Sequence, residues 1–85
     1  MPMNKKILLI DDDLDQATLY LIAFKRAGIT IETADGGHYG LAQARALHPD
    51  LILLDIIMDD MTGIEVLQQL KADSDTKNIP VIMLS

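Results

Sequence analysis

The chain has 85 residues and no cysteine, so it holds at most one domain and excludes disulfide bonds and thiolate metal sites. Thirteen acidic residues against seven lysines and arginines give a formal net charge of −6, which argues against a nucleic-acid-binding surface on this segment. The apolar runs are too short for a membrane span or a signal peptide, and we therefore expect a cytoplasmic protein without membrane contact.

The first predicted strand covers residues 5–10, which end in four large aliphatic side chains. Acids follow at positions 11–13, and Asp13 is well placed to cap the next helix. Apolar residues at helical spacing extend this helix over residues 14–27, and Gly28 suits a left-handed C-terminal cap. The residues expected on the inner face of the helix are Ala17, Tyr20, Leu21 and Phe24.

The second predicted strand, residues 29–33, alternates apolar and polar side chains, which indicates a strand at the border of the sheet. An Asp-Gly-Gly break at residues 35–37 follows it. A second helix is predicted over residues 38–47, and Pro49 ends it because the residue before a proline avoids helical geometry. The residues expected on the inner face of this helix are Leu41, Ala44 and Leu47.

The third predicted strand consists of four large aliphatic residues at positions 51–54, which indicates a strand buried on both faces in the centre of a parallel sheet. Asp55 follows at its carboxyl end, as Asp11 and Asp12 follow the first strand. In open α/β sheets this edge is where ligands bind. A cluster of carboxylates there favours a bound divalent cation.

Residues 62–65, Thr-Gly-Ile-Glu, match a capping box that opens a third helix ending near Ala72. Its expected inner face comprises Ile64, Leu67 and Leu70 or Lys71. The fourth predicted strand, residues 79–84, is apolar throughout, as strands in the interior of a sheet are. We therefore expect the chain to be a fragment of a larger domain, or a second chain to complete the sheet.

Strands that alternate with helices predict an α/β fold with a parallel sheet. Four segments carry a specific pattern: Ile-Asp-Asp-Asp at 10–13, Pro-Asp-Leu-Ile-Leu-Leu-Asp-Ile-Ile-Met at 49–58, Thr-Gly-Ile-Glu-Val-Leu at 62–67 and Pro-Val-Ile-Met-Leu-Ser at 80–85. Together they closely resemble the receiver domain of bacterial-type response regulators. The resemblance implies a flavodoxin-like topology with strand order 2-1-3-4 and then a fifth strand. The fifth strand and the last helices would lie beyond residue 85, so we expect residues 1–85 to form a partial receiver domain.

The resemblance also implies roles for particular residues. Asp55 matches the aspartate that accepts a phosphoryl group from a sensor histidine kinase or a phosphotransfer protein. Asp11 and Asp12 match the acidic pair that binds Mg²⁺ together with Asp55, and Ile57 matches the position whose backbone carbonyl is a further ligand. Ser85 matches the residue whose hydroxyl contacts the phosphoryl oxygen. The implied function is that of a signalling domain rather than of a turnover enzyme.

The chain departs from the family pattern in the loop after Asp55. Asp59 stands where the family has a proline, and Asp60 follows it; we expect both to be exposed loop acids. The family's phosphoryl-binding lysine and aromatic switch residue on the fifth strand would lie beyond Ser85.

Two other functions remain open on the sequence. A phosphohydrolase of the haloacid dehalogenase type also places Asp-x-Asp after its first strand, but Asp15 stands where that family has Thr or Val, and there is no room for its cap insertion. A receiver-like interaction module that is not phosphorylated would instead use the uncovered fourth strand. In either receiver hypothesis, we expect a homodimer joined through that exposed strand.

Overall fold

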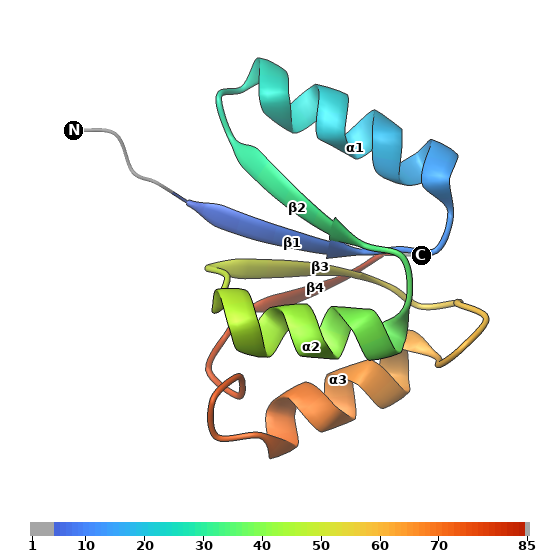
Figure 1. Ribbon diagram of the computed structural model, residues 1–85, viewed down its shortest axis with the longest axis vertical. Coiled ribbons are helices and arrows are strands. Elements are labelled where there is room, and N and C mark those ends of the chain that lie inside the picture. Colours follow the sequence, from blue (N-terminus) through green and yellow to red (C-terminus); the bar gives the residue numbers. More distant parts are fainter. Residues whose placement is uncertain (1–4, 85) are drawn as a thin grey trace.

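The computed structural model describes residues 5–84 and contains, within them, four strands and three helices that alternate along the chain (Figure 1). The elements are β1 (Lys6–Ile10), α1 (Leu14–Arg26), β2 (Thr30–Ala34), α2 (Gly37–Leu47), β3 (Leu51–Asp55), α3 (Gly63–Ala72) and β4 (Val81–Leu84). Every predicted element is present, with bounds within two residues of those expected. None of the helices in the described part of the chain has the length and hydropathy that a membrane span requires.

The strands form one parallel sheet in the order β2-β1-β3-β4, as the resemblance implied. The predicted border position of β2 is confirmed, because β2 is the first strand in this order and pairs with β1 on one side. β4 lies at the opposite edge, beside β3, so the interior position that its apolar run predicts is not found within residues 5–84. β1 and β3 run side by side in the centre, and both end at the same edge.

Two hydrophobic clusters lie on the two faces of the sheet, with α2 and α3 on one face and α1 on the other (Figure 1). The larger cluster comprises Leu8, Ile10, Ala34, Leu41, Ala44, Ile52, Leu54, Met58, Met61, Val66 and Leu70. The smaller one comprises Ile7, Leu9, Ala17, Ile31 and Leu53. Gly40 of α2 lies against Ile10, where a Cβ atom would come within 2.7 Å of that side chain. The close contact holds α2 against β1, just before the acidic residues.

Two predicted inner-face residues are wrong. Leu21 in α1 and Ile64 in α3 are 36% and 49% exposed. In α3 the buried apolar residues are Leu70, as predicted, and Val66, which was not predicted, because the helix is rotated relative to the predicted stripe. The predicted caps are confirmed: Asp13 accepts N–H bonds at the start of α1, and residues 62–65 form a complete capping box on α3.

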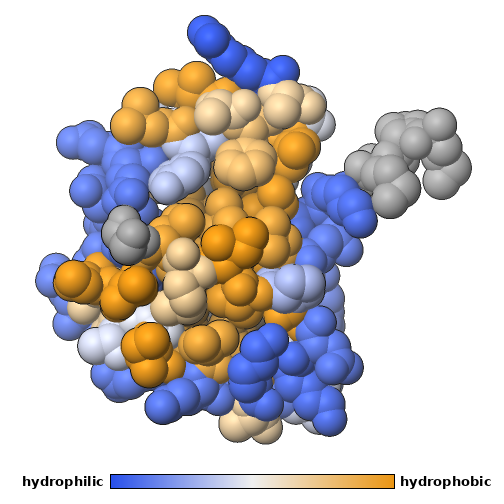
Figure 2. All heavy atoms as spheres, turned by 180° about the vertical axis from the view of Figure 1, so that it is seen from behind, coloured by the Kyte–Doolittle hydropathy of each residue, from blue (hydrophilic) through white to orange (hydrophobic). Residues whose placement is uncertain are grey.

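The face of the sheet that α1 covers is only partly buried. Ile82 of β4 is 50% exposed, and Leu51 and Leu84 are partly buried at the border of the smaller cluster. Figure 2 shows hydrophobic side chains gathered across the rear of the molecule, between polar margins. An apolar surface therefore lies beside the exposed edge of β4.

Candidate functional site

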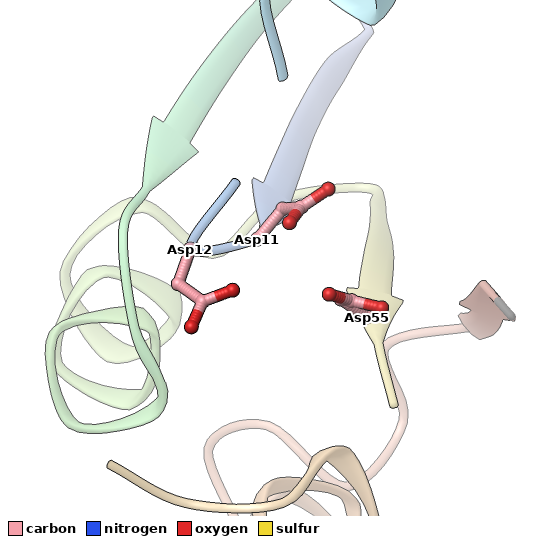
Figure 3. A group of neighbouring side chains, drawn as sticks. All are labelled: Asp11, Asp12 and Asp55. Atoms are coloured by element: carbon pink, nitrogen blue, oxygen red, sulfur yellow. The ribbon is translucent and has the colours of Figure 1, made fainter. Parts of the chain in front are cut away.

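Three carboxylates meet at the carboxyl ends of the two central strands. Asp11 and Asp12 follow β1, and Asp55 is the last residue of β3. One oxygen from each side chain lies within 4.8 Å of the other two, and Figure 3 shows Asp12 and Asp55 extending into the same space from their separate strands. The convergence predicted from the sequence is thus present in the structure, and it arises because adjacent parallel strands end at one edge.

Asp11 is the most constrained of the three, at 2% exposure. Its Oδ1 accepts the backbone N–H of Asp13 at 2.9 Å, whereas its Oδ2 is buried without a hydrogen-bond partner. Burial raises the pKa of Asp11, and the nearby Asp55 carboxylate adds to the rise against the opposing Asp13 N–H. A cation with its bound water would supply the missing partner and neutralise the repulsion, so this donor set suits Mg²⁺, which binds to one or two carboxylates and otherwise keeps water.

The loop from residue 56 to residue 62 closes one side of the site. The N–H of Gly63, at the start of α3, donates to the Ile56 carbonyl at 2.7 Å. A Cβ atom on Gly63 would collide with the carbonyl oxygen of Asp55 and lie 2.8 Å from the Cα of Ile56. Glycine at this position therefore lets α3 begin directly against the end of β3, and the sequence pattern of the capping box did not predict this contact.

Both loop acids are exposed, as expected, but each residue also makes a specific contact that the sequence did not predict. The backbone N–H of Asp59 donates to Oδ2 of Asp12 at 2.9 Å. The carboxylate of Asp60 accepts the N–H groups of His38 at 3.0 Å and Gly37 at 2.9 Å, and these bonds lower the pKa of Asp60. The sequence signal for this contact was the glycine pair that opens α2. Gly36, the N-cap residue, has no side chain with which to cap the helix, so another residue has to accept its first N–H groups.

Two other predicted site residues are not brought into the cluster by any described contact. The side chain of Ile57 is 81% exposed beside the site, and the role of its backbone carbonyl stays a prediction. Ser85 lies outside the described residues.

The family described as "Response regulator receiver domain" matches this chain over residues 7–85. The chain belongs to the response regulator receiver domains. The resemblance inferred from its sequence motifs is thereby confirmed.

Curated relatives of this receiver domain include transcriptional regulators. It is 39% identical to the alkaline phosphatase synthesis transcriptional regulatory protein PhoP of Bacillus subtilis over 83 residues, which are 98% of this chain and 34% of PhoP. It is 36% identical to the DNA-binding response regulator MtrA of Mycobacterium tuberculosis over 83 residues, again 98% of this chain but 35% of MtrA. The receiver domain therefore spans about a third of the length of these relatives.

Solved receiver structures have the same fold. The N-terminal domain of a response regulator receiver protein from Methanoculleus marisnigri superposes with a TM-score of 0.92 at 39% identity, over 94% of this chain and 65% of that one. The chemotaxis protein CheY4 of Vibrio cholerae superposes with a TM-score of 0.88 at 31% identity, over 95% of this chain and 68% of that one. The flavodoxin-like receiver fold is therefore confirmed.

Proposed function

We propose that Asp55 is the phosphoacceptor of this receiver domain and that Mg²⁺ binds beside it. The observation that carries the proposal is the convergence of Asp11, Asp12 and Asp55, in which a buried oxygen of Asp11 has no partner. A structural cluster would satisfy such an oxygen, whereas a cation site leaves it available. In the proposed site Asp12, Asp55 and the Ile57 carbonyl would hold the ion, and Asp11 would bind it through water.

The phosphoryl donor is a phosphohistidine of a sensor histidine kinase or of a phosphotransfer protein. A carboxylate oxygen of Asp55 attacks the phosphorus, the P–N bond of the donor breaks, and its electron pair stays on the imidazole nitrogen. Bound Mg²⁺ supplies charge neutralisation at the phosphoryl oxygens. The contribution of β3 is to hold Asp55 in line at the open edge of the sheet, and Ser85 would contact a phosphoryl oxygen.

The experiment that tests this proposal is incubation with a small phosphodonor such as acetyl phosphate and Mg²⁺, followed by intact mass measurement. We expect the mass of one phosphoryl group on the wild type and none on Asp55→Asn. Asp73→Asn is the matched control, because it removes an equal charge far along the chain and should be labelled as the wild type is. Label on Asp55→Asn would show that the acceptor is misassigned, and release of free phosphate with repeated turnover would favour a phosphohydrolase instead.

A second proposal concerns assembly, and it also covers the hypothesis of an interaction module that is not phosphorylated. We propose that two copies of the chain pair through β4, because this strand joins only β3 within residues 5–84 and carries the half-exposed Ile82. Ile82→Lys would place a charge on the edge and should yield a monomer by light scattering. A wild-type monomer at micromolar concentration would contradict the pairing.

A cytoplasmic location, and the place of residues 1–85 as part of a longer receiver domain, stay predictions of the sequence.

A further inference from the structure

The loop between β3 and α3 is fastened at two consecutive residues to two different parts of the molecule. The N–H of Asp59 is bound to the Asp12 carboxylate at the site, and the carboxylate of Asp60 is bound to the first N–H groups of α2. Because one residue follows the other, the position of Asp59 depends on where Asp60 is held. The bond to Asp12 is specific to the present sequence, since a proline at position 59 would have no N–H to donate.

The contact between Asp60 and α2 depends on the glycines at the start of the helix as well as on the acid itself. A Cβ atom on Gly36 would lie 3.1 Å from Oδ1 of Asp60, and one on Gly37 would lie 2.8 Å from Cβ of Met61. Both glycines therefore leave room for the loop to approach the helix. The first turn of α2 contains no acid of its own, so Asp60 supplies the negative charge that a helix N-terminus favours.

The helix to which Asp60 binds is itself held against the site strand, by the close contact of Gly40 with Ile10. A continuous path therefore runs from β1 through α2 to Asp60, and from Asp59 back to Asp12, two residues beyond Ile10. We propose that Asp60 is a positioning residue for the metal site, because it holds the loop on α2 and so keeps the Asp59 N–H on the Asp12 carboxylate. The inference rests on the proposed Mg²⁺ site and adds a residue that does not touch the ion.

The test compares two substitutions that remove the same charge. Asp60→Ala removes both bonds to α2, whereas Asp60→Asn keeps one oxygen that can accept one of the two N–H groups, and asparagine is an equally good N-cap residue. In Mg²⁺ titrations followed by amide NMR shifts, we expect Asp60→Ala to weaken binding roughly tenfold, as loss of an outer-shell partner does. Asp60→Asn should weaken binding clearly less than Asp60→Ala, because it keeps one of the two bonds. Equal weakening by both variants would show a charge effect alone, and no weakening by Asp60→Ala would overturn the inference.

A second readout without metal separates this inference from the proposed function. We expect the Asp59 amide proton to exchange faster in Asp60→Ala than in the wild type or in Asp60→Asn, because its bond to Asp12 is lost. Asp73→Ala is the matched control for general loss of stability and should leave this amide unchanged. If the wild type does not bind Mg²⁺, the proposed function fails. If Asp59 exchange is the same in all variants, the positioning role of Asp60 fails.

Discussion

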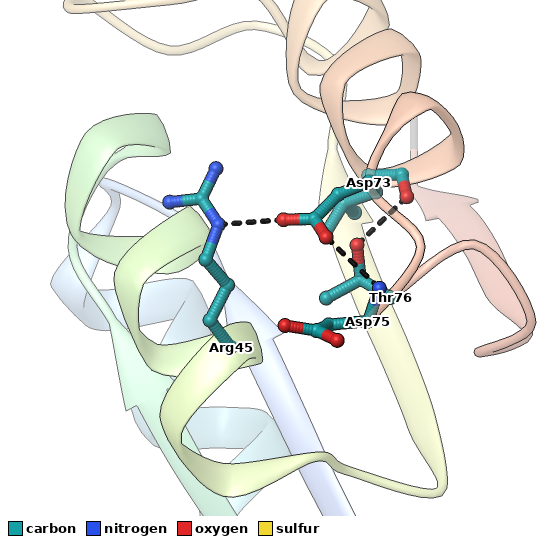
Figure 4. Close-up of polar contacts among 5 residues, drawn as sticks. Arg45, Asp73, Asp75 and Thr76 are labelled. Carbon is teal, nitrogen blue, oxygen red and sulfur yellow. Dashed lines mark hydrogen bonds and ion pairs between the residues drawn. The ribbon is translucent and has the colours of Figure 1, made fainter.

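Two acidic regions of this small domain are arranged in opposite ways. At the turn after α3, Asp73 accepts Nε of Arg45 at 2.8 Å and the backbone N–H of Asp75 at 2.9 Å (Figure 4). The bond from Arg45 is the main reason that the pKa of Asp73 is lowered. Beneath it, the buried hydroxyl of Thr76 donates to the Leu70 carbonyl at 2.7 Å. Both the Asp73 carboxylate and the buried Thr76 hydroxyl therefore have partners, and we expect them to contribute to stability.

At the carboxyl edge of the sheet, by contrast, one buried carboxylate is only half satisfied by hydrogen bonds. Asp11 has one buried oxygen that no donor reaches, and its pKa is raised mainly by burial. An unpartnered buried carboxylate costs free energy, whereas the paired carboxylate of Asp73 does not. The comparison suggests a criterion for the proposed site: the acid that lacks a partner in its buried position, Asp11, distinguishes it better than the number or exposure of the acids does.

The largest expected effect tests how closely the backbone is packed at the site. Gly63→Ala forces a Cβ atom onto the Asp55 and Ile56 backbone, and we expect a loss of about 3 kcal/mol in the free energy of unfolding. Urea unfolding measures it. Gln69→Ala, on an exposed position of the same helix, should change stability by less than about 0.5 kcal/mol. A neutral Gly63→Ala would show that the loop moves aside and does not fix the site.

The stability of the turn after α3 should depend on the buried hydroxyl of Thr76. Thr76→Val removes the bond to Leu70 at nearly constant volume, and we expect a loss of about 1 to 2 kcal/mol in urea unfolding. Thr18→Val is the matched control, because the hydroxyl of Thr18 makes a similar bond on an exposed helix face. Mg²⁺ affinity should be the same in both variants. A changed Mg²⁺ affinity in Thr76→Val would break the division between a structural and a functional region.

Substitution of Asp11 at the carboxyl edge of the sheet should change stability in the opposite direction. Asp11→Asn removes a buried charge from beside Asp55, and we expect the metal-free domain to gain about 1 kcal/mol of stability. The wild type should be stabilised by millimolar Mg²⁺, and the variant less so, because binding to the folded state shifts the unfolding equilibrium. Thermal unfolding with and without Mg²⁺ measures both quantities. A wild-type melting temperature that does not respond to Mg²⁺ would contradict the metal site itself.

Much of this arrangement follows from the sequence, because apolar runs that end abruptly in acids predict parallel strands with carboxylates at one edge. The order of the elements, the border position of β2 and the meeting of Asp11, Asp12 and Asp55 could all be predicted in this way. Each depends on periodicity or on strand polarity, which are local properties of the chain.

The contacts that hold the loop could not be predicted in the same way. The Asp60 carboxylate meets α2 across 23 residues of sequence, and the Asp59 N–H meets Asp12 across 47. Such pairs depend on the packing of whole elements, and no spacing rule connects them. The exposed position of Ile64 has a similar cause, because the rotation of α3 follows from its packing against the sheet and not from its own apolar residues.

The smallest expected effect is a difference in pH dependence between the two regions. The folded pKa of Asp73 lies below its ordinary value of 3.8, so the contribution of Asp73 is present at neutral pH and is lost as the pH falls through the folded pKa. The folded pKa of Asp11 lies above 3.8, so its cost is present at neutral pH and is relieved as the pH falls through that raised pKa. We therefore expect the stability advantage of metal-free Asp11→Asn over the wild type to shrink on acidification. The deficit of Asp73→Asn should shrink as well, but only at lower pH. Urea unfolding of the three proteins in EDTA between neutral and acidic pH measures both differences. If the two variants lost their differences from the wild type over the same pH range, the contrast between an unpaired and a paired carboxylate would be wrong.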